Sequence, residues 1–184
     1  MPPYLAPPYF SLSRLPITTK IGLTCFYLMI LGALAFTGFV VFEERTGYDA
    51  DRAHENFRGN EWRYEQGESP AQPIAEKSPR QRTDIIHPHS FLMPILFFIL
   101  VHLMEMTRAP RGLKILLYVT AFASTVVVIA APYLVYESRA WAGVLIAAAI
   151  GQLATYALMI LAPMGEMWLR RSPTPTDTAA TPKC

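Results

Sequence analysis

The stretch IIHPHSFLMPILFFILVHLMEM, residues 85–106, decides how this chain folds and where any chemistry would lie. Its ionisable residues are three histidines and one glutamate, and the rest is mainly apolar. It is long enough to cross a bilayer, because a helix rises about 1.5 Å per residue and the hydrocarbon core is about 30 Å thick. An ionisable side chain inside a membrane is costly and usually functional. Three of the chain's four histidines lie here: His87, His89 and His102.

Apolar runs of similar length occur elsewhere in the chain. The predicted membrane helices span residues 21–42, 85–107, 113–136 and 141–169. Each is near or above the ~20 residues that a spanning helix needs, and soluble proteins rarely contain even one such run. The charged residues, 16% of the chain, concentrate between the runs. The sequence therefore predicts an all-α integral membrane protein, an up-down bundle of four transmembrane helices with a long extracytoplasmic loop between helices 1 and 2.

The distribution of basic residues predicts the orientation. On one side lie residues 1–20, the loop between helices 2 and 3, and the tail 170–184, which is read as disordered. Their basic residues are Arg14, Lys20, Arg108, Arg111, Lys114, Arg170, Arg171 and Lys183. The loop 43–84, on the other side, has seven basic but ten acidic residues. The positive-inside rule then places both termini in the cytoplasm, and we expect the bacterial inner membrane as the location.

The long extracytoplasmic loop divides into two parts by composition. Residues 47–65 mix charges with aromatic residues, and either a short amphipathic helix or an irregular loop fits them; Trp62 and Tyr64 would then anchor the segment at headgroup level. Residues 66–83 contain three prolines and read as an extended connector. A loop of this length is more often a docking feature than a mere link.

The second span carries the main cofactor hypothesis, which is b-type haem. His87 precedes Pro88, which suits the first turn of a helix and places His87 at the helix mouth. In a continuous helix His87 and His102 would lie roughly 22 Å apart and within ~60° of each other, one near each membrane surface, with His89 about 140° away from His102. Pro94 is expected to bend the same helix, so these angles, which assume a straight helix, are approximate.

Haem binding needs a second axial ligand, and the other three spans contain no histidine. A methionine could serve, as in cytochromes with His/Met ligation, and the candidates are Met29, Met159 and Met164. Otherwise the partner histidine must come from another subunit or a second copy of the chain.

Two other sites use the same residues. His87 and His89, together with His54 or a loop carboxylate such as Asp84, could bind copper or zinc at the extracytoplasmic mouth. His102, Glu105 and Arg108 are spaced three apart and share a helix face.

The His102, Glu105 and Arg108 cluster could contact quinone or relay protons. The structural alternative is an ordinary ion pair at headgroup level, with His102 hydrogen-bonded to a neighbouring helix.

The fourth span carries small residues every four positions, a pattern that lets another helix approach closely. They are Gly143, Ala147, Gly151 and Thr155, and with Trp62 of the loop they form the predicted interface set. The partner is either the first span, through Ala33 and Thr37, or another subunit. Gln152 lies mid-membrane and is expected to hydrogen-bond between helices, because an unsatisfied amide in hydrocarbon is unfavourable.

Motifs of soluble enzymes, including phosphate loops and H-E-x-x-H, are missing, and a nucleic-acid partner is not expected. The third span has no ionisable group between Lys114 and Glu137, which argues against transport. The sequence is best interpreted as a small, non-catalytic integral subunit of a larger membrane complex, an electron-transfer assembly, acting as scaffold or docking subunit in the lipid bilayer. Its partners would be other membrane subunits or further copies of itself. The alternatives are a subunit that binds b-type haem or contacts quinone, and an extracytoplasmic Cu/Zn-binding protein.

Overall fold

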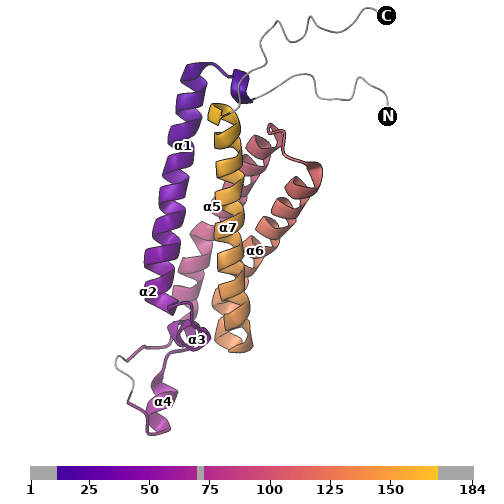
Figure 1. Ribbon diagram of the computed structural model, residues 1–184. Helices are drawn as coiled ribbons and strands as arrows, with labels where there is room; N and C mark the ends of the chain where they lie inside the picture. Colours follow the sequence, from indigo (N-terminus) through magenta and orange to yellow (C-terminus); the bar gives the residue numbers. More distant parts are fainter. Residues whose placement is uncertain (1–11, 70–72, 170–184) are drawn as a thin grey trace, which may run out of the picture.

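A computed structural model describes residues 12–69 and 73–169 of the 184-residue chain, and its regular elements there are all helical (Figure 1). Four helices are long and apolar enough to cross a membrane: Ile17–Thr46, α5 (Pro79–Glu105), α6 (Arg111–Glu137) and α7 (Ala140–Leu169). The first of these comprises α1 (Ile17–Phe36), a π-helical turn (Thr37–Phe42) and α2 (Glu43–Thr46). The predicted class, a four-span helical membrane protein, is confirmed. The predictions for residues 1–11 and 170–184 lie outside the described residues.

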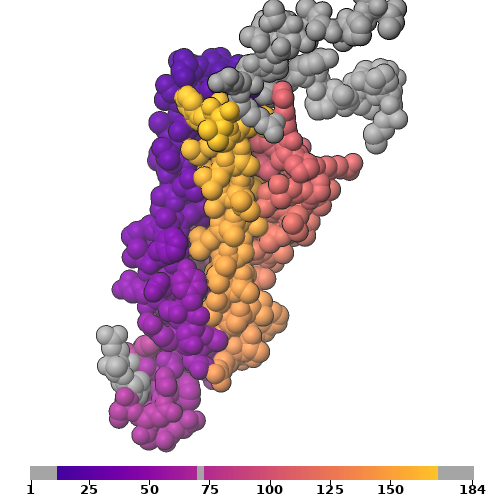
Figure 2. Space-filling model, viewed as in Figure 1, coloured from indigo at the N-terminus to yellow at the C-terminus, as the bar shows by residue number. Residues whose placement is uncertain are grey.

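Helix α7 is the centre of the bundle. It packs against α6, α5 and α1, and it is the most buried of the four long helices, whereas α5 is the least buried (Figure 1). The main apolar core joins all four, with fully buried Tyr27 of α1, Leu100 and Met104 of α5, and Met159 and Ile160 of α7. In Figure 2, α1, α7 and α6 form a continuous wall of side chains along the long axis of the molecule.

Helix α5 begins earlier than the sequence analysis expected. Ser78 caps it through a reciprocal pair of bonds with Gln81, and Pro79 occupies the first helical position, where its missing N–H has no cost. Pro88 therefore lies inside the helix, and His87 is a helical residue rather than one at the mouth. The last part of the expected connector, from Pro79 onward, is helical as well.

The first span contains a π-helical turn, Thr37–Phe42, in which the backbone hydrogen bonding changes. The hydroxyl of Tyr48 donates to the carbonyl oxygen of Gly38 at 2.8 Å, and Gly38 is buried beside Leu153 of α7. A methyl group at position 38 would lie 2.7 Å from the Leu153 side chain, so glycine permits the close approach of α1 and α7. π-Helical turns of this kind often occur at functional sites.

Side chains from elsewhere in the fold satisfy carbonyl groups at the ends of three long helices. Lys114 donates to the carbonyl of Glu105 in α5 at 2.9 Å, His54 Nδ1 bonds Val135 O in α6 at 2.8 Å, and Lys20 donates to Met167 O in α7 at 3.0 Å. The last four carbonyls of a helix have no partner within it, and cations near them also complement the helix dipole. Two flanking lysines of the positive-inside pattern thus also cap helices.

The segment after the first span folds into a small extramembrane cap, which we define as residues 47–69 and 73–78. It contains α3 (Ala50–Arg58) and α4 (Glu61–Glu65). The carboxylate of Asp49 caps α3 by accepting from the backbone N–H groups of its first turn. Ala53 and Phe57 of α3 are buried against the ends of α6 and α7. Residues 50–58 and 61–65 are helical, so this region is not an irregular loop, and the anchoring of Trp62 and Tyr64 at headgroup level stays a prediction.

Candidate functional site

The outer face of α5 carries two of the predicted cofactor ligands. His87 and His102 are both exposed on the bundle surface, and between them Phe91, Ile95 and Phe98 are each more than half exposed. The spacing of these five residues, four, four, three and four, places them on one face of the helix. We call this face the α5 stripe. His89 is half-buried and lies off the stripe.

The hydrogen bonds of these histidines are local. His102 Nδ1 lies 2.9 Å from the carbonyl oxygen of Phe98, and His89 Nδ1 lies 2.6 Å from that of Ile85. In each case the ring N–H donates to the carbonyl one turn earlier, which directs the Nε2 lone pair away from the helix. His87 packs edge-on against Phe91, with ring centroids 5.4 Å apart.

A second haem ligand is not placed beside the α5 stripe by the rest of the described chain. Met159 is fully buried in the core, and Met29 is exposed on α1, which packs against α7. Met164 is half-buried in the core around α7. Each α5 histidine therefore offers one ligand, and the described residues place no second ligand opposite it.

The predicted copper or zinc site does not form within one chain. His54 is engaged with the carbonyl of Val135 on α6, as described above, and so acts as a helix cap. Among the described residues, no three His, Cys, Asp or Glu side chains are close enough to hold one metal ion. His87, His89 and His54 are thus not brought together, because α3 lies over α6 and α7 instead of over α5.

The residues near the other end of α5 also pair differently from the expected cluster. Glu105 Oε1 accepts from the hydroxyl of Tyr118 at 2.7 Å, and its Oε2 lies 3.5 Å from Lys114 Nζ. The backbone N–H of Arg108 donates to Glu166 Oε2 at 2.7 Å. None of these three interactions involves His102, so at this end Glu105 pairs with α6 and the loop residue Arg108 pairs with α7, and the structure does not show a His102–Glu105–Arg108 relay.

The small residues of α7 do not form one buried face. Gly143 and Ala147 are exposed, whereas Gly151 faces Ser124 of α6 and Thr155 is buried. A Cβ built on Gly151 would lie 3.2 Å from Ser124 Oγ, so the close approach at Gly151 is to α6.

Gln152 of α7 bonds between helices, as the sequence analysis predicts. Its amide nitrogen donates to Thr125 Oγ1 of α6 at 2.9 Å and lies 3.1 Å from Met93 Sδ of α5. It is buried and joins three spans.

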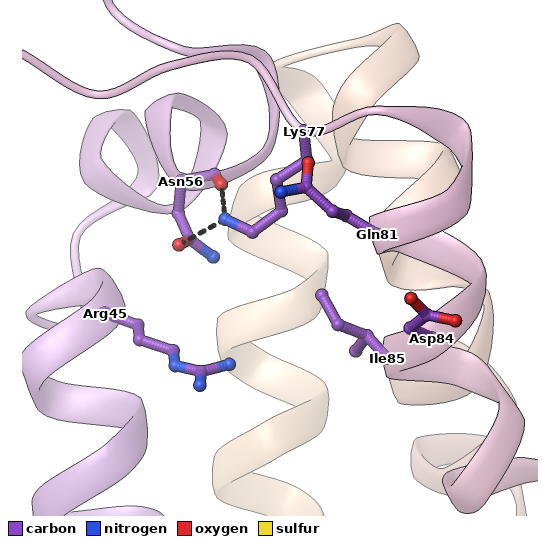
Figure 3. Close-up of a pocket in the computed structure, with 6 residues that line it drawn as sticks. All are labelled: Arg45, Asn56, Lys77, Gln81, Asp84 and Ile85. Carbon is purple, nitrogen blue, oxygen red and sulfur yellow. Dashed lines mark hydrogen bonds between the residues drawn. The ribbon is translucent and has the colours of Figure 1, made fainter.

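A pocket at the junction of the cap and the bundle was missed by the sequence analysis. It has a volume of about 440 Å³ (Figure 3). Its lining residues are Arg45, Asn56, Lys77, Gln81, Asp84 and Ile85. They come from the end of the first span, from α3, from the segment just before α5 (Lys77), and from the start of α5. No periodic pattern links positions so far apart in the chain, so only the folded structure could find them.

Lys77 is the most enclosed cation of this pocket. Its ammonium donates to the backbone carbonyl of Asn56 and, at 2.8 Å, to Asn56 Oδ1. Burial lowers the pKa of Lys77, and the charge of the nearby Arg45 lowers it further. Two cations therefore face the same small space.

Comparison with known proteins identifies the kind of domain. Residues 47–174 match the Aq_1264_TM family, described as a transmembrane helical domain. The match covers more than half of the chain. The chain belongs to this family. It has no match among curated proteins or among solved structures.

The Aq_1264_TM match begins at Gly47, where the first span ends, and so includes the cap together with α5, α6 and α7. Within the fold these parts form one packed unit, because α3 lies against both α6 and α7. The matched residues of this chain contain the cap, the α5 stripe and all of the pocket lining except Arg45, which lies just before them.

Proposed function

We propose that this protein is a docking subunit of a larger membrane complex, in which the four spans anchor the folded cap and the cap binds the partner. The observation that carries the proposal is the exposed tip of the cap. In α4, Trp62 and Tyr64 are 40% and 44% exposed. Helix α4 projects beyond α3, away from the bundle (Figure 1). Exposed tryptophan and tyrosine on a rigid support are typical of binding hot spots.

The rigidity of the cap supports this proposal, since a preorganised surface loses less entropy on binding. Arg63 of α4 pairs with Glu55 of α3 at 2.7 Å, and Glu55 is buried. The side chain of Asn60 accepts from the N–H of Ile74 at 2.8 Å, which ties α4 to the segment that returns to α5. These contacts fix α4 against α3 and against the segment that leads to α5, so the cap holds one conformation.

The central position of α7 also directs the partner to the cap. Of the small residues of α7 considered as a contact surface, Gly151 faces Ser124 of α6 and Thr155 is buried, so only Gly143 and Ala147, near the start of α7, are exposed. With both termini in the cytoplasm, as the basic residues suggest, the cap faces the extracytoplasmic side. The partner then binds there.

Replacement of Trp62 tests the proposal. The complex is extracted from native membranes in a mild detergent and its mass is measured for wild type, Trp62→Ala and Trp141→Ala. Trp141 is the matched control, because it is 42% exposed at the start of α7, outside the cap. We expect the larger complex with wild type and Trp141→Ala, and the isolated chain with Trp62→Ala. A wild-type chain that runs alone, or a complex that survives Trp62→Ala, would contradict docking through the cap.

A second candidate function is electron transfer through b-type haem held between two chains. The favouring observation is the α5 stripe: His87 and His102 lie exposed on one face, and the Nδ1–H bond of His102 leaves Nε2 free to ligate. The same stripe of a second copy, or of another subunit, would supply the missing axial ligands. Quinone contact through His102 and Glu105 is less favoured, because Glu105 is engaged with α6.

A reduced-minus-oxidised visible spectrum of the purified full chain tests this candidate. A haem α-band that disappears in His102→Gln but persists in His54→Gln would support it, because His54 lies in the cap and its ring bonds Val135. A featureless spectrum of both the isolated chain and its intact complex would exclude haem and leave the docking role alone.

A further inference from the structure

The pocket between the cap and the bundle has walls of opposite charge. Arg45 extends into it from the end of the first span, and Gln81, Asp84 and Ile85 line it from α5 (Figure 3). Lys77 and Asn56 close it on the cap side. The cationic side is formed by Arg45 and Lys77, and the carboxylate of Asp84 stands on the α5 side.

The charges of this pocket are incompletely paired by the chain itself. Within the described residues, Arg45 and Asp84 form no ion pair with each other or with another side chain. Lys77 uses its bonds to Asn56 and retains a third ammonium proton. Burial, and after it the charge of Arg45, lowers the pKa of Lys77, and an anionic group between the two cations would offset both effects.

The depth of the pocket matches the headgroup layer of a bilayer. Arg45 lies one residue before the end of the first candidate span, Ile17–Thr46. Ile85 begins the apolar run of α5, directly after Asp84, the last charged residue before it. The pocket therefore lies at the boundary between the apolar spans and the polar cap, where phosphate and amine groups of lipids are found.

We propose that this pocket binds the headgroup of an aminophospholipid, with its phosphate between Arg45 and Lys77 and its ammonium at Asp84. A guanidinium can bond two phosphate oxygens at once, which gives orientation as well as affinity. Asn56 and Gln81 add amide groups that can donate to the remaining oxygens. Ile85 faces the side on which the glycerol and acyl chains continue into the membrane.

Asp84 distinguishes this ligand from a purely anionic one. The Asp84 carboxylate repels the phosphate of every candidate ligand. Only a zwitterion offsets this repulsion, because its ammonium pairs with the carboxylate, so phosphatidylglycerol or free phosphate should bind more weakly. A primary ammonium donates hydrogen bonds to the carboxylate, whereas the trimethylated group of phosphatidylcholine has no N–H to donate. The binding order is therefore expected to be phosphatidylethanolamine above both of the others.

Native mass spectrometry of the full chain, titrated with each of the three lipids, tests the order. We expect phosphatidylethanolamine to bind about tenfold more weakly to Arg45→Gln and to Asp84→Asn, because each removes one charge-assisted contact. Arg45→Lys should recover part of the loss. Arg80→Gln is the matched control: Arg80 is exposed one residue after Pro79 and does not line the pocket, so its variant should bind as wild type.

Four results would overturn the assignment. Equal binding of phosphatidylethanolamine and phosphatidylcholine, or an unchanged Asp84→Asn, would show that the amine is not recognised. Unchanged binding by Arg45→Gln would remove the phosphate contact. Displacement of the bound lipid by an equal concentration of O-phosphoethanolamine would show that a soluble headgroup suffices and that the lipid is not the preferred occupant. Thermal unfolding of each variant distinguishes loss of binding from loss of fold.

Discussion

The cap and the bundle reach a defined structure by different means. The bundle is held by apolar packing along four helices, with a few polar bridges such as Gln152 to Thr125. The cap has a small buried core around Ala53 and Phe57, and it adds ion pairs and backbone bonds, among them Arg63 with Glu55. Apolar packing is spread over many residues, whereas polar contacts depend on individual atoms. The cap should therefore be the more sensitive of the two to single substitutions.

The largest expected effect is that of Gly59→Ala in the cap. Gly59 joins α3 to α4 with φ +81° and ψ 173°, a region that is essentially restricted to glycine and costs other residues about 1–3 kcal/mol. A Cβ there would also lie 2.8 Å from the backbone nitrogen of Glu76 and 2.9 Å from the carbonyl oxygen of Ile74. We expect the cap to open, measured as rapid proteolysis between α3 and α5 while the spans stay helical.

Gly67→Ala is the matched control for this variant. Gly67 also has a positive φ, +80°, but a Cβ there meets no atom within 4 Å. Its substitution isolates the backbone strain from the collision with residues 74–76. Similar proteolysis of both variants would show that the close approach at Gly59 does not hold the cap together.

The same contrast explains which features the sequence predicts. The spans follow from length and hydrophobicity, which need no knowledge of the partners of any residue. The cap pocket, in contrast, joins Arg45, Lys77 and Asp84, and nothing in their spacing indicates that they meet. The start of α5 lies between these cases. Ser78, Pro79 and Gln81 form a capping-box signature that indicates the observed start, whereas Pro88, interpreted as a first-turn proline, indicates a later one.

The histidines show the limit of periodicity as a guide to sites. Periodicity places His87 and His102 on one face of α5, and both are exposed there. Periodicity does not indicate which residues lie opposite that face. In the fold, His54 bonds to α6 and Glu105 bonds to Tyr118. A ligand set depends on tertiary contacts, so the residue types were visible in the sequence and their partners were not.

A smaller effect is expected for Gln152→Met in the bundle. The substitution keeps the side-chain length and removes the bond to Thr125, so we expect a loss of about 1 kcal/mol in the free energy of unfolding, the range found for polar contacts between membrane helices. Chemical unfolding in detergent measures it. Gln66→Met, at the exposed end of α4, is the control and should be neutral. A loss above that of Gly59→Ala would reverse the proposed ranking of cap and bundle.

The smallest expected effect is that of Tyr27→Phe on α1. Tyr27 is fully buried, and its hydroxyl has no hydrogen-bond partner among the described residues. Removal of an unsatisfied buried hydroxyl should leave the stability unchanged or raise it by up to about 1 kcal/mol. Tyr156→Phe is the matched control, because Tyr156 is equally buried but its hydroxyl lies 3.0 Å from Thr125 Oγ1, and its loss should destabilise the bundle.

The two tyrosine variants together also report on the isolated chain. Both are measured by unfolding in detergent and again in the complex extracted from membranes. If Tyr27→Phe destabilises as much as Tyr156→Phe in both states, the hydroxyl of Tyr27 has a partner within the chain, contrary to the prediction. A loss that appears only in the complex would mean that the core around Tyr27 rearranges on assembly and gives its hydroxyl a partner, because that hydroxyl is fully buried in the single chain.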